Sequence, residues 1–213
     1  MFEASTLYLF ILASVTLVII PGPAVLYIVA RGIDHGRLGG LVSVLGIETG
    51  GFFHVSAASL GLSAILASSA LAFSVVKYLG AAYLIYLGVR SFLDSEPLVL
   101  DQADSRTRSL RGIYTQGVIV NVLNPKTALF FLAFLPQFVD PQRGQIALQV
   151  LLLGLLFVLI ATISDSLYAL LSGTLGQWLK EHLQVMRAQR YFSGGVYIAL
   201  GLFTAFSGAV ENT

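Results

Sequence analysis

Long apolar stretches alternate with short polar breaks along the whole chain. Each apolar stretch is long enough to cross a membrane, because about 20 consecutive apolar residues span a bilayer as an α-helix. The pattern therefore predicts an all-α, polytopic membrane protein with six transmembrane helices. These helices cover residues 5–30, 38–64, 69–91, 113–136, 146–172 and 191–210.

The composition agrees with a membrane location. Hydrophobic residues make up 56% of the 213 residues and charged residues only 11%, with a mean hydropathy of +0.84. A soluble domain carries about 25% charged residues, so this chain has too little charge to cover a soluble surface. The first apolar run lacks the basic segment of a signal peptide and is longer than a typical signal core. We therefore expect this run to be a retained helix.

Cysteine content and net charge exclude several functions. The chain has no cysteine, which rules out disulfides, thiol catalysis and cysteine-ligated metal sites. The formal net charge of +1 gives no reason to expect nucleic acid as a partner. No feature of the sequence implies a cofactor, so none is expected.

The distribution of basic residues predicts the orientation in the membrane. Short loops rich in Lys and Arg face the cytoplasm. Nine of the twelve Lys and Arg residues fall in or beside three breaks on one side, and only Arg143 lies on the other side. The nine are Arg31, Arg37, Arg90, Arg106, Arg108, Arg111, Lys180, Arg187 and Arg190. This asymmetry places both termini outside.

A long polar segment divides the single domain, residues 1–213, into two sets of three helices. The helices at 5–91 and at 113–210 are joined by a predicted cytoplasmic loop at about 92–112. A duplicated unit with three spans must sit in inverted topology, and inverted repeats build many secondary transporters. Both halves carry a proline in their first helix, in IIPGPAV and in LNPKTA. The sequence thus predicts two inverted three-helix repeats, although single proline kinks are also ordinary in membrane helices.

Four ionisable residues lie deep inside the predicted helices: Glu48, His54, Lys126 and Asp165. With a rise of about 1.5 Å per helical residue, Glu48, Lys126 and Asp165 fall near the middle of a core about 30 Å thick. The two proline breaks reach a similar depth. Ionisable residues inside a membrane mark substrate or ion pathways by default, so these groups are the first candidates for a site.

The proline breaks suit the same role. Irregular backbone at this depth is tolerated only where it is buried in protein or lines a cavity. A half-helix that begins at Asn124 and Pro125, together with Lys126, attracts a carboxylate. Glu48 and Asp165 can receive an ammonium group or carry a proton, so the set suits a small zwitterion. The predicted substrate-binding residues are Pro21, Gly22, Pro23, Glu48, Asn124, Pro125, Lys126 and Asp165, of which Glu48 and Asp165 are also the predicted proton-coupling residues.

Each of these residues also has a purely structural interpretation. Glu48 and Asp165 can be carboxyl groups that hydrogen-bond to a neighbouring helix. Lys126 can pair with either carboxylate simply to neutralise charge. His54 has no neighbour in sequence that fixes a role, and packing is the simpler explanation for it. These alternatives stay open at this point.

Four stretches together resemble the LysE/RhtB family of amino-acid exporters. They are PGPA, GIETGGFFHVSAASLGLSAIL, KYLGAAYLIYLGVRSF and NPKTALFFLAFLPQF, and the similarity extends to length and to the six-span plan. The residues that match the family motifs are Pro21, Gly22, Pro23, Gly46, Glu48, Gly50, Asn124, Pro125 and Lys126. Asp165 is placed by its depth in the membrane, and His54 also looks similar to the family without gaining a role.

The resemblance implies an exporter in the bacterial inner membrane that moves amino acids out of the cytoplasm, driven by the proton gradient. It also implies a homo-oligomer, with a dimer favoured. Small neutral or hydrophobic substrates such as homoserine, threonine or leucine are favoured because Lys126 pairs with one carboxylate, while lysine and arginine stay open. The expected mechanism is alternating access with proton antiport, in contact with the lipid bilayer.

Three rival functions belong to other classes. A divalent-metal exporter would use Glu48, His54 and Asp165 as ligands, although the lack of cysteine and the single deep histidine argue against it. A membrane enzyme would need a nucleophile and a base in a defined arrangement, and the sequence offers none. A membrane assembly protein without transport would tolerate neutral replacements at Glu48 and Lys126.

Overall fold

The computed structural model describes two long segments of the chain and several single positions. The segments are residues 2–68 and 109–181, with backbone alone for 62–68, 133 and 173–181. The single positions are 75, 78, 82, 85, 86, 89, 92, 93, 191, 195, 198, 199 and 202. Apart from these single positions, the predicted helices at 69–91 and 191–210 and most of the predicted loop therefore lie outside the described residues. Every element in the described part is helical, which confirms the all-α prediction.

The first predicted helix is broken where the sequence places its prolines. Helix α1 spans Ala4–Ile19, and Ile20 then adopts an extended conformation with φ −74° and ψ 113°. The chain resumes as helix α2, Pro23–Ser68. Proline suits the first turn of a helix because its missing N–H would have no partner there, so Pro23 starts α2 while Pro21 cannot continue α1.

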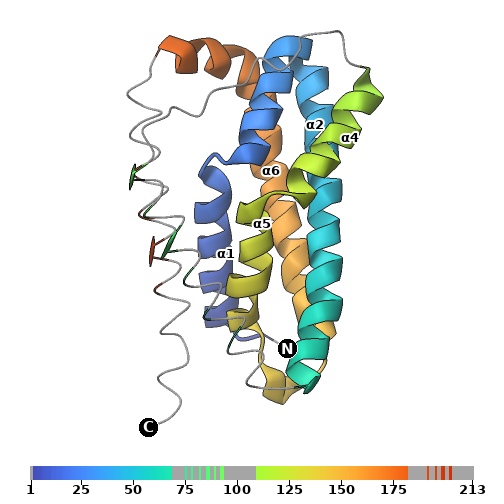
Figure 1. Ribbon diagram of the computed structural model, residues 1–213, viewed down its shortest axis with the longest axis vertical. Helices are drawn as coiled ribbons and strands as arrows, with labels where there is room; N and C mark the ends of the chain where they lie inside the picture. The colour runs from blue at the N-terminus through green and yellow to red at the C-terminus, as the bar shows by residue number, and fades with distance from the viewer. Residues whose placement is uncertain are drawn as a thin grey trace.

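Helix α2 consists of two arms that run in opposite directions (Figure 1). Only Gly36, with φ 68° and ψ −171°, leaves the helical conformation between the arms 23–35 and 37–68. The predicted polar break after residue 30 is therefore a one-residue turn and not a loop. Glycine allows this because positive φ costs it little.

The second broken helix begins with α4, Leu110–Val122, where the side chain of Ser109 accepts a hydrogen bond from the Gly112 amide. It continues after Asn124 as α5, Pro125–Leu129, followed by a π-helical turn η1, Phe130–Phe134, and a 3₁₀ turn η2, Leu135–Phe138. The axis bends by 44° between the two parts. The predicted half-helix after Asn124 is thus confirmed.

Helix α6 spans Ile146–Glu181, a length of 36 residues. It extends nine residues beyond the predicted end at 172, because the polar residues that suggested a loop continue the helix. A short 3₁₀ turn η3, Pro141–Arg143, precedes it. The side chain of Gln149 holds the start of this turn in place. It accepts a hydrogen bond from the backbone N–H of Asp140 and donates one to its C=O, each at 2.9 Å.

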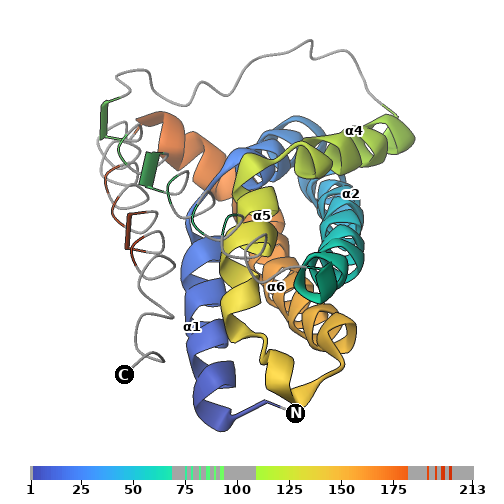
Figure 2. The same ribbon diagram turned by 60° about the horizontal axis from the view of Figure 1, so that its bottom comes forward.

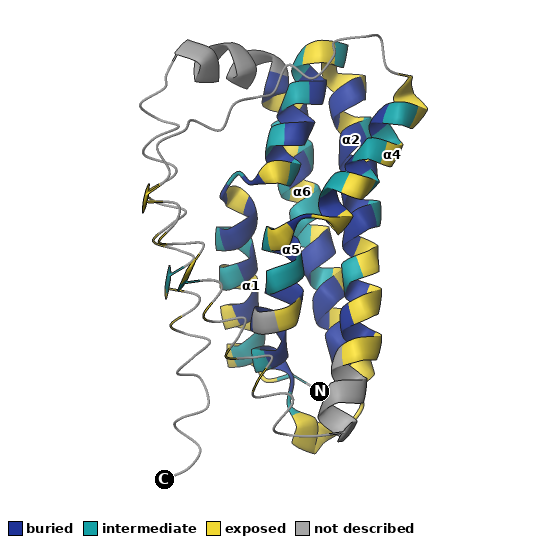
Figure 3. Cartoon of the chain, in the orientation of Figure 1, coloured by how far each residue is buried: buried dark blue, intermediate teal, exposed yellow. Residues whose placement is uncertain are grey.

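Two described helices are long and apolar enough to cross a membrane, Pro23–Gly61 and Ile146–Ser172, and the bent pair α4 and α5 can form a third span. Exposed leucines follow the outer face of α6, where a bilayer can cover them: Leu151, Leu155, Leu159, Leu167 and Leu170. Figure 3 shows the same division between buried inner faces and exposed outer faces on the other helices. These features are those of a membrane protein.

Aromatic side chains and glycines hold the helices together. Phe130 stacks on Phe157 of α6 with ring centroids 4.1 Å apart, inside an apolar cluster that also contains Phe10 of α1. At the crossing of α2 and α4, a Cβ on Gly46 would lie 2.3 Å from the carbonyl oxygen of Tyr114. Only glycine permits that approach. Figure 2 shows α5 between α1 and the second arm of α2, which brings the two helix breaks to neighbouring positions.

Candidate functional site

The two helix breaks touch through Lys126. The ammonium nitrogen Nζ of Lys126 donates a hydrogen bond to the carbonyl oxygen of Ile20, the residue at which α1 ends. The Lys126 side chain crosses over Gly22, where a Cβ would lie 3.1 Å from the lysine Cδ. The broken backbone of α1 thus supplies an acceptor to a cation that comes from the other break.

The break before α5 is capped by its own side chains. The side-chain oxygen of Asn124 accepts a hydrogen bond from the Lys126 amide at 3.0 Å, and Pro125 occupies the first turn, where no backbone donor is needed. The N-terminal end of a helix carries partial positive charge. This end therefore adds to the positive charge of the Lys126 ammonium.

Two buried carboxyl groups face this cation. Glu48, from the second arm of α2, is 7% exposed, and Asp165, from α6, is 5% exposed. They interact electrostatically with each other, and Asp165 also interacts with Lys126. Within the described part of the chain, Oε1 of Glu48 has no hydrogen-bond partner.

A small cavity of about 50 Å³ lies among these groups. Its wall contains five of the eight residues predicted from the sequence: Gly22, Glu48, Asn124, Lys126 and Asp165. Pro21, Pro23 and Pro125 are not in the wall, and they act instead on the backbone that shapes it. The structure thus brings residues from α2, α5 and α6 and from both breaks to one point.

Comparison with known protein families matches residues 15–208 to the LysE type translocator model. The chain belongs to the LysE type translocator family. The resemblance found in the sequence motifs is thereby confirmed.

Sequence similarity to individual relatives extends over nearly the whole length of the chain. A homoserine/homoserine lactone efflux protein of Salmonella typhimurium is 30% identical over 93% of this chain and 95% of its own length. An uncharacterized membrane protein of Vibrio cholerae is 31% identical over 92% of this chain and 94% of its own length. The membrane protein YrhP of Bacillus subtilis is 31% identical over 90% and 94%. No solved structure matches the chain.

Asn121 belongs to the same cavity and was not among the residues predicted from the sequence. It is 5% exposed and lies in the cavity wall. Its Nδ2 donates to the carbonyl of Ile47 at 2.6 Å, while its Oδ1 accepts from Thr127 at 2.9 Å and from Asn124 at 3.4 Å. Asn121 thus links the second arm of α2 to the break before α5. A polar amide at mid-membrane depth in VIVNVLNP was the available signal.

Tyr168 is the second residue that was missed. It lies one helical turn after Asp165 on α6, and its hydroxyl donates to the carbonyl of Ile19 at 2.7 Å. Together with the Lys126 contact to Ile20, this bond satisfies the carbonyls that the proline break sets free at the end of α1. Nothing in the sequence pairs Tyr168 with residue 19, so no signal was available.

His54 has a structural contact and does not line the cavity of the translocator. Its Nε2 lies 2.8 Å from the carbonyl oxygen of Asn121, and its ring stacks on Phe131 with centroids 6.0 Å apart. Because a carbonyl only accepts, Nε2 carries the hydrogen in this contact. Among the residues that the structure describes, no group of three or more His, Cys, Asp or Glu side chains could hold a metal ion. The geometry therefore favours the packing interpretation of His54.

Proposed function

We propose that this translocator exports amino acids across the bacterial inner membrane by alternating access coupled to proton antiport. The observation that carries the proposal is the meeting of two broken helices at a half-buried Lys126, in one cavity with Glu48 and Asp165. Half-helix ends and ionisable groups at mid-membrane depth are the usual components of a transporter site. The Salmonella relative is named for efflux of homoserine and homoserine lactone, which supports the same class of cargo.

The site offers complementary partners for a zwitterion. In this proposal the substrate carboxylate meets the N-terminal end of α5 and Lys126, and the substrate ammonium meets Glu48 or Asp165. Small neutral or hydrophobic amino acids such as homoserine, threonine or leucine suit the site, because Asp165 already interacts with Lys126. Lysine and arginine remain alternatives that the same carboxylates could accept.

Charge balance links the substrate to the proton. Two carboxylates and one ammonium leave the buried site one positive charge short of neutrality. A buried unpaired charge is costly, so the site favours one further positive charge, either a proton on Glu48 or Asp165 or the ammonium of a substrate. The proton and the substrate ammonium neutralise the same excess negative charge, so binding of one displaces the other. This competition is the basis of antiport. Glu48 is our first choice for the proton because its Oε1 lacks a partner among the described residues.

The described conformation corresponds to a closed state. A cavity of about 50 Å³ is far below the 300–1,000 Å³ of typical ligand sites, so transport requires the helices to move apart. The order of the elements suits inverted repeats: α1 and α2 in one half, and α4, α5 and α6 in the other, each begin with a helix broken near its middle. We propose six spans in two such repeats within one domain, with the breaks as flexible points.

The proposed orientation places the Gly36 turn and the start of α4 in the cytoplasm and both termini outside. This choice rests on the distribution of Lys and Arg along the sequence. A homo-oligomer, with a dimer favoured, completes the proposal, and lipid surrounds the exposed leucines. The carrier needs no cofactor, and we propose no enzymatic activity for it.

Transport into inside-out membrane vesicles tests the proposal. The panel contains the twenty amino acids and homoserine, with and without an acidic vesicle lumen. An antiporter accumulates its substrate only when the lumen is acidic, and a protonophore abolishes the accumulation. Equal rates with and without the gradient would refute antiport. If no amino acid moves, a parallel panel of divalent metal ions tests the rival exporter, and movement of a metal would replace our proposal.

A further inference from the structure

Arg31 is a buried cation outside the cavity. It lies in the last turns of the first arm of α2, close to the Gly36 turn, and is 4% exposed. Its Nε and Nη1 atoms are buried and find no hydrogen-bond partner in the part of the chain that the structure describes. Arg31 and Pro23 are eight residues apart, which corresponds to about 12 Å along a helix. Arg31 is not among the residues that line the cavity beside Lys126.

The neighbours of Arg31 do not neutralise it well. The closest is Asp34, whose Oδ2 lies 3.4 Å from Nη1 without forming a hydrogen bond, and the Asp34 side chain is 39% exposed. The guanidinium also lies 5.5 Å from the centroid of the Tyr27 ring. The hydroxyl of Tyr27 donates to the carbonyl of Ile113 at 2.7 Å, which holds the ring against α4. Arg31 therefore lies between helices of the bundle.

An unsatisfied guanidinium in this position requires an explanation. Arginine keeps its charge in proteins, so it cannot lower the energetic cost of its burial by losing a proton. Most buried polar groups have a hydrogen-bond partner, and exceptions point to a ligand, a water or an ion. His35, one turn further on the same arm, also has a buried atom, Nδ1, without a partner among the described residues. Two side chains of one arm thus present unused polar atoms at this end of the molecule.

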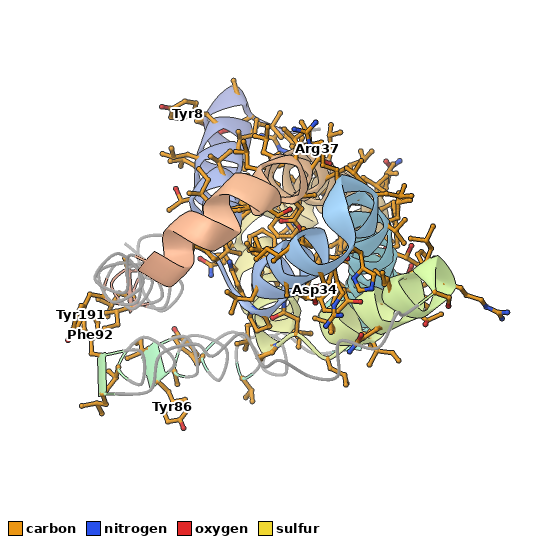
Figure 4. All side chains as sticks on the ribbon, turned by 90° about the horizontal axis from the view of Figure 1, so that it is seen from above. Tyr8, Asp34, Arg37, Tyr86, Phe92 and Tyr191 are labelled. Carbon is orange, nitrogen blue, oxygen red and sulfur yellow. The ribbon has the colours of Figure 1, made fainter. Side chains whose placement is uncertain are left out.

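We propose that Arg31 is a carboxylate-binding residue at the cytoplasmic entrance, where the substrate's carboxylate docks before it reaches Lys126. This inference rests on the proposed function of amino-acid export. A guanidinium binds a carboxylate through charge-assisted hydrogen bonds, and Nε and Nη1 of Arg31 are buried donors without a partner among the described residues. Figure 4 looks down on this end and labels Asp34 and Arg37, which precede and follow the Gly36 turn. Binding of the anion satisfies Arg31 and so favours opening of this end.

A lipid phosphate has similar oxyanion chemistry, but burial argues against it. A guanidinium that contacts headgroups lies at an exposed position, as Arg37 does on the other side of the turn. Arg31 is buried beside Tyr27, whose ring is fastened to α4. The interior position favours a small anion that enters between the helices.

Thermal unfolding of the purified full-length protein tests anion binding directly. The probe is sodium acetate, compared with sodium chloride at equal ionic strength, for wild type, Arg31→Gln, Arg31→Lys and the matched control Arg37→Gln. We expect acetate to raise the Tm of wild type and Arg37→Gln, and Arg31→Gln to lose most of that increase. Arg31→Lys, which keeps the charge without the guanidinium, should retain part of that increase. An equal increase in wild type and Arg31→Gln would refute the proposal. A difference that appears only with anionic lipid would also refute it.

Transport by inside-out vesicles tests the role of the site. Homoserine has a free carboxylate, whereas homoserine lactone has none and keeps the ammonium. We expect Arg31→Gln to raise KM for homoserine about tenfold, the loss of a single charge-assisted contact, and to leave KM for the lactone within about twofold. Equal effects on both compounds would refute carboxylate recognition. If wild type moves neither compound, the proposed function fails for this cargo, while the acetate experiment still decides whether Arg31 binds a carboxylate.

Discussion

The two helix breaks look alike in sequence but are held in different ways. At the break between α1 and α2, the free carbonyls of Ile19 and Ile20 bond to Tyr168 of α6 and to Lys126 of α5. The break between α4 and α5 is held mainly by residues at the break itself, Asn121, Asn124 and Thr127. The first break therefore depends on the positions of other helices. The second is largely self-supporting, with two further bonds to the second arm of α2, from Asn121 to the Ile47 carbonyl and from His54 to the Asn121 carbonyl.

This difference indicates which break can respond when a proton or a substrate binds in the site. Lys126 interacts electrostatically with Asp165, which in turn interacts with Glu48. A change of charge at the two carboxyl groups is therefore felt by the lysine that bonds Ile20. We expect the first break to move when a proton or a substrate binds, while the second break keeps its shape and presents the end of α5.

The largest expected effect comes from removing one carboxylate. In Glu48→Gln, the positive charge of Lys126 is balanced by Asp165 alone. No unbalanced negative charge is then left for a proton or a substrate ammonium to neutralise. Loss of one partner of a buried charged contact costs about 2–5 kcal/mol, so we expect proton-driven export to fall by about 100-fold or more. Uptake by inside-out vesicles measures this. The control is Glu3→Gln at the exposed start of the chain, where Glu3 pairs with Arg143. Unchanged gradient-driven uptake in Glu48→Gln would remove Glu48 from the mechanism.

The next effect comes from cutting the link between the breaks. Lys126→Met keeps a side chain of similar length over Gly22 but leaves the Ile20 carbonyl without its donor and the two carboxylates without their cation. We expect export to fall by about tenfold or more, because each lost interaction of a buried charge costs at least about 1.5 kcal/mol. Circular dichroism checks that the variant is helical. Export at the wild-type rate would show that the link is dispensable.

The sequence was sufficient where a local rule decides the structure. Proline removes a donor and clashes with the preceding turn, so the breaks at Pro21 and at Asn124–Pro125 could be predicted. The constant rise per residue of a helix placed Glu48, Lys126 and Asp165 at one level, and they line one cavity.

Such local rules could not predict the contacts between helices that are distant in the sequence. The bond from Asn121 to Ile47 spans 74 residues and that from Tyr168 to Ile19 spans 149, and hydrophobic periodicity does not say which helices are neighbours. The one-residue turn at Gly36 and the extension of α6 to Glu181 were missed for another reason. Polar residues that leave the hydrocarbon core can continue a helix, so a polar run does not by itself mark a loop.

A smaller effect on export is expected from loosening the self-supporting break. Asn121→Ala removes the bonds to Ile47, Asn124 and Thr127, each worth about 0.5–1.5 kcal/mol. We expect the free energy of unfolding to fall by about 2–3 kcal/mol, with a proportionate loss of folded protein and an almost normal export rate per folded molecule. Chemical denaturation and vesicle uptake, normalised to folded protein, separate the two quantities. A large loss of rate with normal stability would contradict the view that this break keeps its shape.

Tyr168→Phe is expected to have the smallest effect on stability. It is also the most direct test of whether the first break moves while the second does not. The substitution removes only the hydroxyl that bonds the Ile19 carbonyl, at a cost of about 1 kcal/mol, and the matched change Thr127→Val removes one hydroxyl from the other break. If the first break moves during transport, Tyr168→Phe should change the export rate by about threefold while Thr127→Val leaves it unchanged, although their stabilities differ little. The double variant Lys126→Met/Tyr168→Phe should be non-additive, because the two groups bond adjacent carbonyls of the same break, those of Ile20 and Ile19. Equal effects of the two hydroxyl deletions on rate would mean that both breaks move together.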